Sequence, residues 1–263
     1  MIVWTVANQK GGVGKTTTTI ALAGVLAEQG HRVLLIDTDP HASLSYYFGI
    51  ESEDLDLSVY DLFTQVSSQE QILQSLCPTK YPNIDILPAT MGLATLDRSL
   101  GTKGGMGLVL KKAIHTLTDS YDYVLIDCPP VLGVLMVNAL AAADHIVIPV
   151  QTEFLALKGL DRMIKTIEIM QGEQKSSFKY TIVPTMFDKR TKASILAFKK
   201  LQEVYTDNIW PGVIPIDTNL RNASSAQKVP SDYAANSRGT LAYKSLLNFL
   251  IKHKISIMRL NPT

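Results

Sequence analysis

The chain has 263 residues, and its 25 lysines and arginines nearly balance its 24 acidic residues, for a formal net charge of +1. This length, with 46% hydrophobic residues, suits a folded protein whose core needs neither disulfides nor a structural metal. The near-neutral balance excludes binding to nucleic acid or an anionic membrane through overall charge alone. Any such contact requires a local basic patch.

The cysteines and the apolar runs predict a cytoplasmic protein. Cys77 and Cys128 are isolated, with no C-x-x-C pair and no histidine at a zinc-like spacing, which indicates a reducing compartment and no metal cluster. The N-terminus lacks the features of a secretory signal, and no apolar run is long enough to span a bilayer.

The first forty residues predict a strand, a loop, a helix and a second strand. Residues 2–8, "IVWTVAN", are apolar and rich in β-branched side chains, which favours a strand. Helical spacing runs from 16 to 29 and stops at Gly30, a common residue after a helix. Residues 32–40, "RVLLIDTDP", predict a buried strand closed by a proline. This is a βαβ opening.

The same alternation continues along the chain and predicts an α/β fold. Further strands are expected at 83–89, 121–130, 145–151, 180–188 and 212–217. Helical candidates separate them, at 92–100, 106–118, 133–143, 156–171 and 192–205. Apolar strands alternating with helices indicate a mainly parallel, twisted sheet covered by helices on both faces, in three layers. We expect one domain over 1–263, with ligands at the carboxyl ends of the strands.

Two stretches depart from this alternation. Residues 51–82 predict short helical pieces and no clear strand, so we interpret them as an irregular helical excursion that covers a sheet edge or serves as a partner surface. Residues 101–107, "GTKGGMG", resemble a phosphate loop only in composition. No strand precedes them, which favours a flexible connection.

The stretch "NQKGGVGKTTTTIA", residues 8–21, has the chemistry that a polyphosphate requires. Glycines let backbone N–H groups approach the phosphates, Lys15 supplies a cation for the β and γ oxygens, and the Thr16 hydroxyl supplies a ligand for Mg²⁺. A glycine-rich turn without a ligand is the weaker interpretation, because strand, glycines, Lys-Thr and helix occur in order. The predicted nucleotide contacts are Lys10, Gly11, Gly12, Val13, Gly14, Lys15, Thr16 and Thr17.

The loop also deviates from the usual phosphate-loop pattern. Gln9 stands where the first glycine is expected, and Lys10 adds a second lysine. In this respect K-G-G-x-G-K-T-T after "NQ" resembles the deviant Walker A motif of the ParA and MinD class of P-loop ATPases. The resemblance implies a P-loop NTPase fold, ATP with Mg²⁺, and an ATP-dependent homodimer in which Lys10 reaches the phosphates bound by the other subunit.

Two further motifs match this class. "DTDP" at 37–40 resembles its switch I, which implies that Asp39 handles the attacking water, and "VLIDCPP" at 124–130 resembles Walker B with switch II. Asp127, at a strand end, can hold the magnesium shell. Either aspartate alone could be a helix cap, but together they favour catalysis. The predicted catalytic residues are Lys10, Lys15 and Asp39, and the predicted metal ligands are Thr16, Asp39 and Asp127.

Late loops supply base contacts in this class, which makes Met186 and Pro215 the expected adenine neighbours. His41 stands where relatives often have glutamine after D-P. We interpret it as a polar residue near the phosphates in preference to a catalytic histidine.

The cargo is assigned by resemblance alone. Several stretches, among them "DPHASL", "PPVLGVLMVNALAAAD" and "IPIDTNLRNAS", are similar to the ParC-type ATPases of polar chemotaxis clusters. This implies slow, partner-stimulated hydrolysis, a cargo-adaptor protein and concentration at a cell pole. Partition on nonspecific DNA, with localisation on the nucleoid, is the alternative. A MinD-like membrane protein is the second alternative, but the last helix is apolar in a pattern that suits packing on the sheet.

Overall fold

The computed structural model describes residues 1–65, 68–96, 106–174 and 178–260. Its centre is a seven-stranded sheet in the order β3-β4-β2-β5-β1-β6-β7, and all pairs are parallel except β3 with β4. The strands are β1 (Ile2–Val6), β2 (Val33–Asp37), β3 (Cys77–Pro78), β4 (Ile84–Leu87), β5 (Tyr123–Asp127), β6 (His145–Gln151) and β7 (Tyr180–Thr185).

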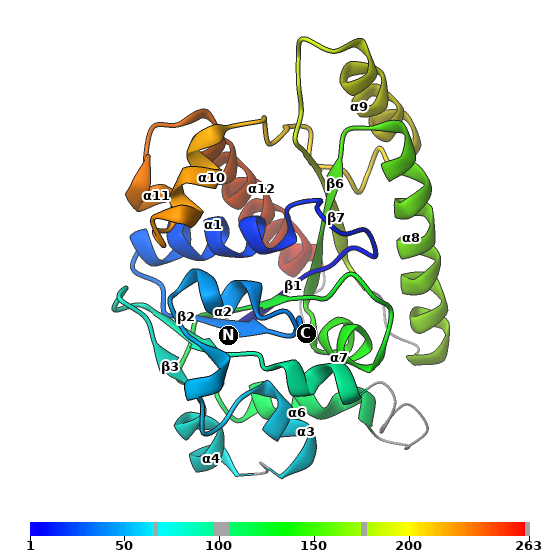
Figure 1. Ribbon diagram of the computed structural model, residues 1–263. Helices are drawn as coiled ribbons and strands as arrows, with labels where there is room; N and C mark the ends of the chain where they lie inside the picture. The colour runs from blue at the N-terminus through cyan, green and yellow to red at the C-terminus, as the bar shows by residue number, and fades with distance from the viewer. Residues whose placement is uncertain (66–67, 97–105, 175–177, 261–263) are drawn as a thin grey trace.

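Helices cover both faces of the sheet, so the three-layer α/β prediction is confirmed (Figure 1). On one face lie α1 (Lys15–Glu28), α10 (Thr218–Ser225), α11 (Pro230–Tyr233) and α12 (Arg238–Leu260). The other face carries α3 (Val59–Thr64), α4 (Gln69–Gln74), α6 (Val109–His115), α7 (Val134–Ala142) and α8 (Phe154–Gln174). Two further helices are α2 (Ser43–Tyr47) and α9 (Lys192–Val204).

The strands are apolar throughout because alternate side chains enter different cores. In β5, Val124 and Ile126 pack with the residues of α7, whereas Tyr123 and Leu125 pack with those of α1. This explains why the strands show continuous apolar runs in place of alternation. No helix among the described residues is long and apolar enough to cross a membrane.

Residues 212–217 do not form the expected strand. Only an isolated bridge joins Phe187 to Pro215, in which the Phe187 N–H donates to the Ile214 carbonyl (3.0 Å). Prolines at 211 and 215 lack backbone donors, which prevents a continuous ladder. The segment therefore runs beside β7 as an extended loop.

The expected excursion at 51–82 contains short helices, as predicted, but also a strand that the sequence did not indicate. β3 has two residues and pairs with β4 in an antiparallel hairpin, too short to show a periodic pattern. A 3₁₀ helix, Met91–Thr95, occupies the start of the helix expected at 92–100, and another, Met106–Leu108, precedes α6. Most of "GTKGGMG" lies outside the described residues, as does the end of that expected helix.

Gly24 allows α1 to pack closely against the segment that begins α11. A Cβ at this position would lie 2.8 Å from Val229 Cβ and 2.9 Å from Ser231 Oγ. Gly24→Ala should therefore lower the free energy of unfolding by about 1–3 kcal/mol, as overpacking usually does. Chemical denaturation measures this change. Gly172→Ala, on α8 with open space around the glycine, is the control and should not destabilise; equal stability of both variants would contradict the predicted clash.

Candidate nucleotide site

The sheet order places three predicted site segments at one edge. β5 lies between β2 and β1, and the register sets Asp127 beside Asp37 on one side and beside Val6 on the other. All three strands are parallel, so their carboxyl ends open at the same edge, where the loop between β1 and α1 also lies (Figure 1). The fold thus brings the phosphate loop, "DTDP" and "VLIDCPP" together.

The conformation of the phosphate loop depends on glycine and on neighbours distant in sequence. Gly12 and Gly14 have φ angles of 72° and 89°, a region that favours glycine. Asn8 fixes the entrance: its side-chain amide donates to the Pro149 carbonyl (2.8 Å) and its Oδ1 accepts from Lys10 N (2.9 Å). The loop is therefore held in place without a ligand.

Gln9 has a structural role that the sequence did not indicate. Its Nε2 donates to Thr166 Oγ1 on α8 (2.8 Å), and farther along the loop the carbonyl of buried Val13 accepts from Thr185 Oγ1 (2.9 Å). The residue that replaces the first glycine thus ties the loop to α8.

Lys15 begins α1 and is 8% exposed. Burial lowers the pKa of its ammonium group, while the negative charge of Asp127 acts in the opposite direction. Its Nζ lies 3.3 Å from the Lys10 carbonyl, so the side chain curls back over the loop. α1 has no side-chain N-cap, and its first N–H groups therefore remain available to an anion beside this cation.

Thr16 and Asp127 meet directly. Thr16 Oγ1 donates to Asp127 Oδ2 at 2.6 Å, and Thr19 Oγ1 lies 3.4 Å from Oδ1. Asp127 is 1% exposed, and its burial, followed by the charge of Asp37, raises its pKa to about 8. A carboxylate held in this environment is strongly stabilised by a cation.

Asp37 is a functional candidate that the sequence analysis missed. It is fully buried, and burial raises its pKa to about 6. Its Oδ2 accepts hydrogen bonds from Ser45 N (2.9 Å) and Ser45 Oγ (2.8 Å), and its Oδ1 accepts from Asp39 N (3.1 Å). The first aspartate of "DTDP" therefore supports the loop that carries the second. Its place near the end of a predicted strand was the available signal.

Asp39 lies beyond the end of β2 and is paired with His41. Asp39 Oδ1 accepts from His41 N (3.0 Å) and lies 2.9 Å from His41 Nδ1. The side chain of Asp39 is 16% exposed and that of His41 is 78% exposed. Asp39 is thus at the surface of the site, whereas Asp127 is at its floor.

Lys10 forms an ion pair with Glu153, the residue before α8. Both side chains are partly exposed, so the pair lies at the surface. The sequence analysis missed Glu153, because no motif surrounds it.

A pocket of about 440 Å³ opens beside the phosphate loop. The predicted base neighbours Met186 and Pro215 line it together with Gly14 and Thr17. Met186 directly follows β7 and has a φ angle of 51°, which is unusual for a residue other than glycine. The structure therefore brings Met186 and Pro215 to the same cavity as the phosphate loop.

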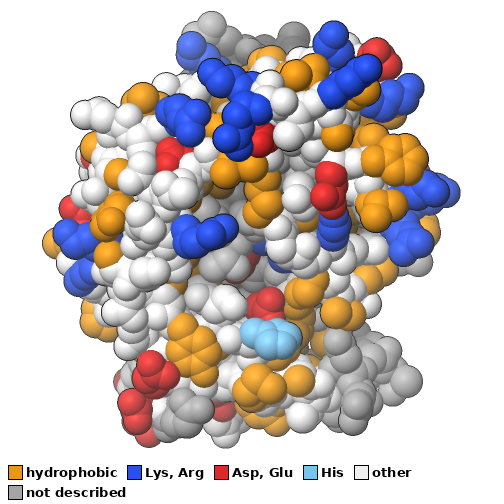
Figure 2. Space-filling view, turned by 45° about the horizontal axis from the view of Figure 1, so that its top comes forward, with side chains coloured by type: hydrophobic (Ala, Val, Ile, Leu, Met, Phe, Trp, Pro, Cys, Tyr) orange, Lys and Arg blue, Asp and Glu red, His pale blue; other side chains and the backbone are white. Residues whose placement is uncertain are grey.

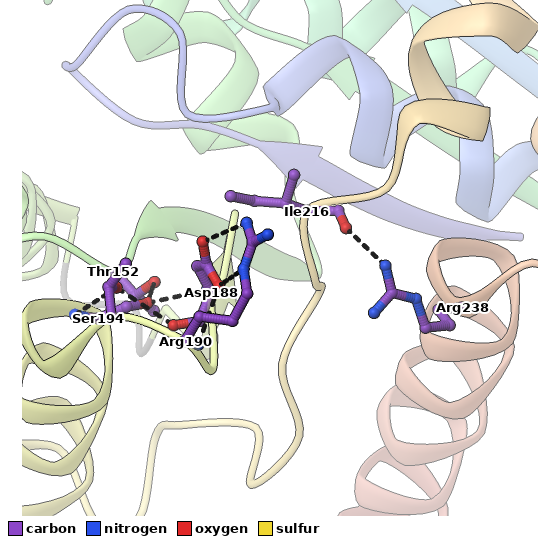
Figure 3. Close-up of polar contacts among 7 residues, drawn as sticks. Thr152, Asp188, Arg190, Ser194, Ile216 and Arg238 are labelled. Atoms are coloured by element: carbon purple, nitrogen blue, oxygen red, sulfur yellow. Dashed lines mark hydrogen bonds and ion pairs between the residues drawn. The ribbon is translucent and has the colours of Figure 1, made fainter.

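A second groove lies on the other side of Pro215 and Ile216, which line both cavities. Figure 3 shows Arg190 and Arg238 on its two walls: Arg190 forms two bonds to Asp188 (2.9 and 2.8 Å), and Arg238 donates to the Ile216 carbonyl (3.4 Å). The charge of Arg190 is thus balanced within its own loop.

The donors at this site fit a magnesium nucleotide. Oxygen ligands from Thr16, Asp127 and Asp39 suit a hard cation, and the described part of the chain contains no cluster of three or more acidic, histidine or cysteine ligands that could hold a metal by itself. Mg²⁺ in proteins commonly uses one or two carboxylates together with substrate phosphates and water. The basic loop and the helix N-terminus provide the phosphate half of such a site.

The comparisons with known proteins agree with this site. A family model described as "AAA domain" matches residues 1–180. The sporulation initiation inhibitor protein Soj of Bacillus subtilis is 37% identical over 242 residues, covering 92% of this chain and 94% of Soj. The chromosome partitioning protein ParA of Caulobacter vibrioides is 36% identical over 252 residues, covering 95% and 93%.

Among solved structures, the cobyrinic acid a,c-diamide synthase of Mycobacterium smegmatis, with bound ADP and magnesium, superposes with a TM-score of 0.83. It is 33% identical, and the match covers 97% of this chain and 96% of that one. The chain therefore belongs to the ParA/Soj family of P-loop ATPases, as the deviant Walker A motif predicted. Its cofactors are accordingly ATP and Mg²⁺.

Proposed function

We propose that this protein is a slow, ATP-dependent dimerising switch that positions a cellular cargo, most specifically a polar chemotaxis array or the flagellar pole. The observation that carries the proposal is the convergence of Lys15, Thr16, Asp127 and Asp39 at the carboxyl ends of adjacent parallel strands. Soj and ParA, named for sporulation control and chromosome partitioning, support a positioning role.

In the proposed cycle, each residue has a separate task. Lys15 and the N–H groups of α1 bind the phosphates. Thr16 and Asp127 would hold Mg²⁺, which would supply positive charge to the phosphate oxygens when bound. Asp39 orients the attacking water. Lys10 leaves Glu153 and completes the site of a second copy, so the nucleotide links the two subunits. Loss of the γ-phosphate then loosens the loops after β2 and β5.

Asp39→Ala should accumulate the ATP-bound dimer, because nucleotide still binds while the water loses its carboxylate. Phosphate release should fall by about 100-fold or more, in the range typical of a lost general base. Light scattering after size exclusion, with ATP and Mg²⁺, measures the dimer. The control is Asp119→Ala, which removes an exposed aspartate just before the amino end of β5, whereas the site lies at the carboxyl end of that strand. Wild-type turnover by Asp39→Ala would mean that another group handles the water.

The polar cargo is supported by the stretches similar to ParC-type ATPases and by the ion pairs that several lysines and arginines form within the chain. Arg190 is paired with Asp188, Lys200 with Glu203 and Lys244 with Glu28, which partly neutralises basic side chains that could otherwise contact DNA. Figure 2 shows lysine and arginine side chains gathered over the upper part of the face shown there. A cargo-adaptor protein that speeds hydrolysis is part of the proposal.

Partition on nonspecific DNA is the second candidate, and the names of Soj and ParA favour it. The experiment that separates the two is binding of nonspecific duplex DNA to the Asp39→Ala dimer at low salt. A dimer that carries DNA, with an affinity that falls steeply as salt rises, would support partition. A dimer that does not bind DNA would support a protein receptor at the pole.

A metabolic role is a further candidate, since the solved structure from Mycobacterium smegmatis bears the name of a diamide synthase. A screen of small-molecule acceptors in the phosphate-release assay distinguishes this role. Turnover that rises only with a small acceptor would favour it over a positioning switch.

A further inference from the structure

We propose that His41 is a positioning residue for Asp39: its Nδ1–H holds one carboxylate oxygen, so that the other faces the water. The inference rests on the proposed role of Asp39. It concerns a residue of the "DTDPH" segment to which the proposed cycle assigns no task.

The backbone brings His41 to Asp39 through a tight turn. Ala42 N donates to the Asp39 carbonyl (2.8 Å), and Pro40 occupies the second position of the turn, where its fixed φ is favourable. Ala42 itself has a φ of 51°, which starts α2 at once after the turn. The turn therefore places the backbone of His41 beside Asp39, within reach of the imidazole.

Both donors reach the same oxygen. His41 N lies 3.0 Å and His41 Nδ1 lies 2.9 Å from Asp39 Oδ1, and among the described residues no donor reaches Oδ2. The backbone bond alone is a common local feature of aspartate in turns. The second bond opposes rotation about the Cβ–Cγ bond, which would exchange the two oxygens, so Oδ2 stays available in one orientation.

The protonation pattern of the imidazole follows from its partner. An ionised carboxylate only accepts hydrogen bonds, so Nδ1 carries the proton and Nε2 faces outward. The His41 side chain is 78% exposed, and burial of apolar surface therefore does not explain its orientation. The bond to Asp39 does.

Steady-state kinetics test this role. His41→Ala should lower kcat for ATP about tenfold, as loss of a supporting hydrogen-bond partner commonly does, while KM stays nearly constant. His41→Asn, whose side-chain amide can occupy the position of Nδ1, should recover most of kcat. His115→Ala, which removes an exposed histidine of α6, is the matched control. Unchanged kcat in His41→Ala would overturn the proposal.

A second measurement does not depend on activity. Long-range ¹H–¹⁵N NMR of the ligand-free protein should show His41 as the Nδ1–H tautomer, and Asp39→Ala should shift it to the more common Nε2–H tautomer. An Nε2–H tautomer in the unmodified protein would overturn the inference, even if His41→Ala failed to fold.

The outcomes separate this inference from the proposed function. If Asp39→Ala hydrolyses ATP at the wild-type rate, the role of Asp39 fails and the inference fails with it. If Asp39→Ala is inactive and His41→Ala is fully active, only the inference fails.

Discussion

Lys15→Ala is expected to weaken ATP binding by at least about 30-fold, because truncating one partner of a buried charge pair costs about 2–5 kcal/mol and each 1.4 kcal/mol is a factor of ten. The side chain is 8% exposed and lies over the loop, 3.3 Å from the Lys10 carbonyl. In this position its charge has little water around it and would meet the phosphates directly. Calorimetric titration with a nonhydrolysable ATP analogue and Mg²⁺ measures the loss.

The control for this prediction is Lys165→Ala, which removes an exposed lysine of α8. It should bind the analogue as the unmodified protein does. Thermal unfolding of the ligand-free variants checks that Lys15→Ala is folded. Full affinity in folded Lys15→Ala would place the phosphate site elsewhere in the chain.

Lys10→Ala is expected to keep ATP but to lose the dimer. Lys10 is paired with Glu153, and Lys15 is the lysine assigned to the phosphates of its own chain, so removal of Lys10 should leave those contacts intact. The clearest background is Asp39→Ala, in which hydrolysis does not shorten the life of the complex. Light scattering after size exclusion with ATP and Mg²⁺ should give a dimer for Asp39→Ala and a monomer for the double variant.

Glu153→Ala in the same background is the matched control, since it breaks the same ion pair and keeps the lysine. The proposed role of Lys10 in the second subunit requires that this variant still dimerises. If both variants were monomers, the ion pair itself would be what the dimer needs. A dimer in the Lys10→Ala double variant would remove the role of this lysine across the interface.

The parts of the site that sequence could predict are those where one local pattern determines both conformation and chemistry. Gly12 and Gly14 adopt the positive φ angles that the motif implies. Thr16, at the start of the helix after the loop, contacts Asp127, at the end of a strand, as the two motifs suggested. The sequence alone was enough to predict that Asp127 lies near the phosphate loop, because the carboxyl ends of parallel strands share one edge of the sheet.

The missed contacts join segments far apart in the chain. Gln9 bonds to Thr166 and Lys10 to Glu153, which are 157 and 143 residues away, and no local pattern specifies such partners. Asp37 was missed for another reason. Its burial beside Asp127 follows from the order of β2 and β5 in the sheet, which a single sequence does not determine.

The strands too were predicted correctly where a local pattern determines them and missed where it does not. Six of the predicted strands exist because continuous apolar runs persist on a sheet buried on both faces. The segment 212–217 is similarly apolar, but its prolines lack backbone donors, so only a single bridge to Phe187 forms in place of a strand ladder. β3 could not be predicted because a strand of two residues is too short to show an alternating pattern.

The two edges of the sheet also restrict how copies of this chain can associate. One edge is the two-residue β3, and the other, β7, is shielded at Ile182 by an isolated bridge to Ile209. Long unpaired strands are what allow sheets of separate molecules to fuse, and short or covered edges oppose such fusion. Copies of this protein are therefore not expected to join through a continuous intermolecular sheet, which would persist or aggregate. The proposed dimer uses instead the loops around the nucleotide, where contact can be made and broken with each round of ATP.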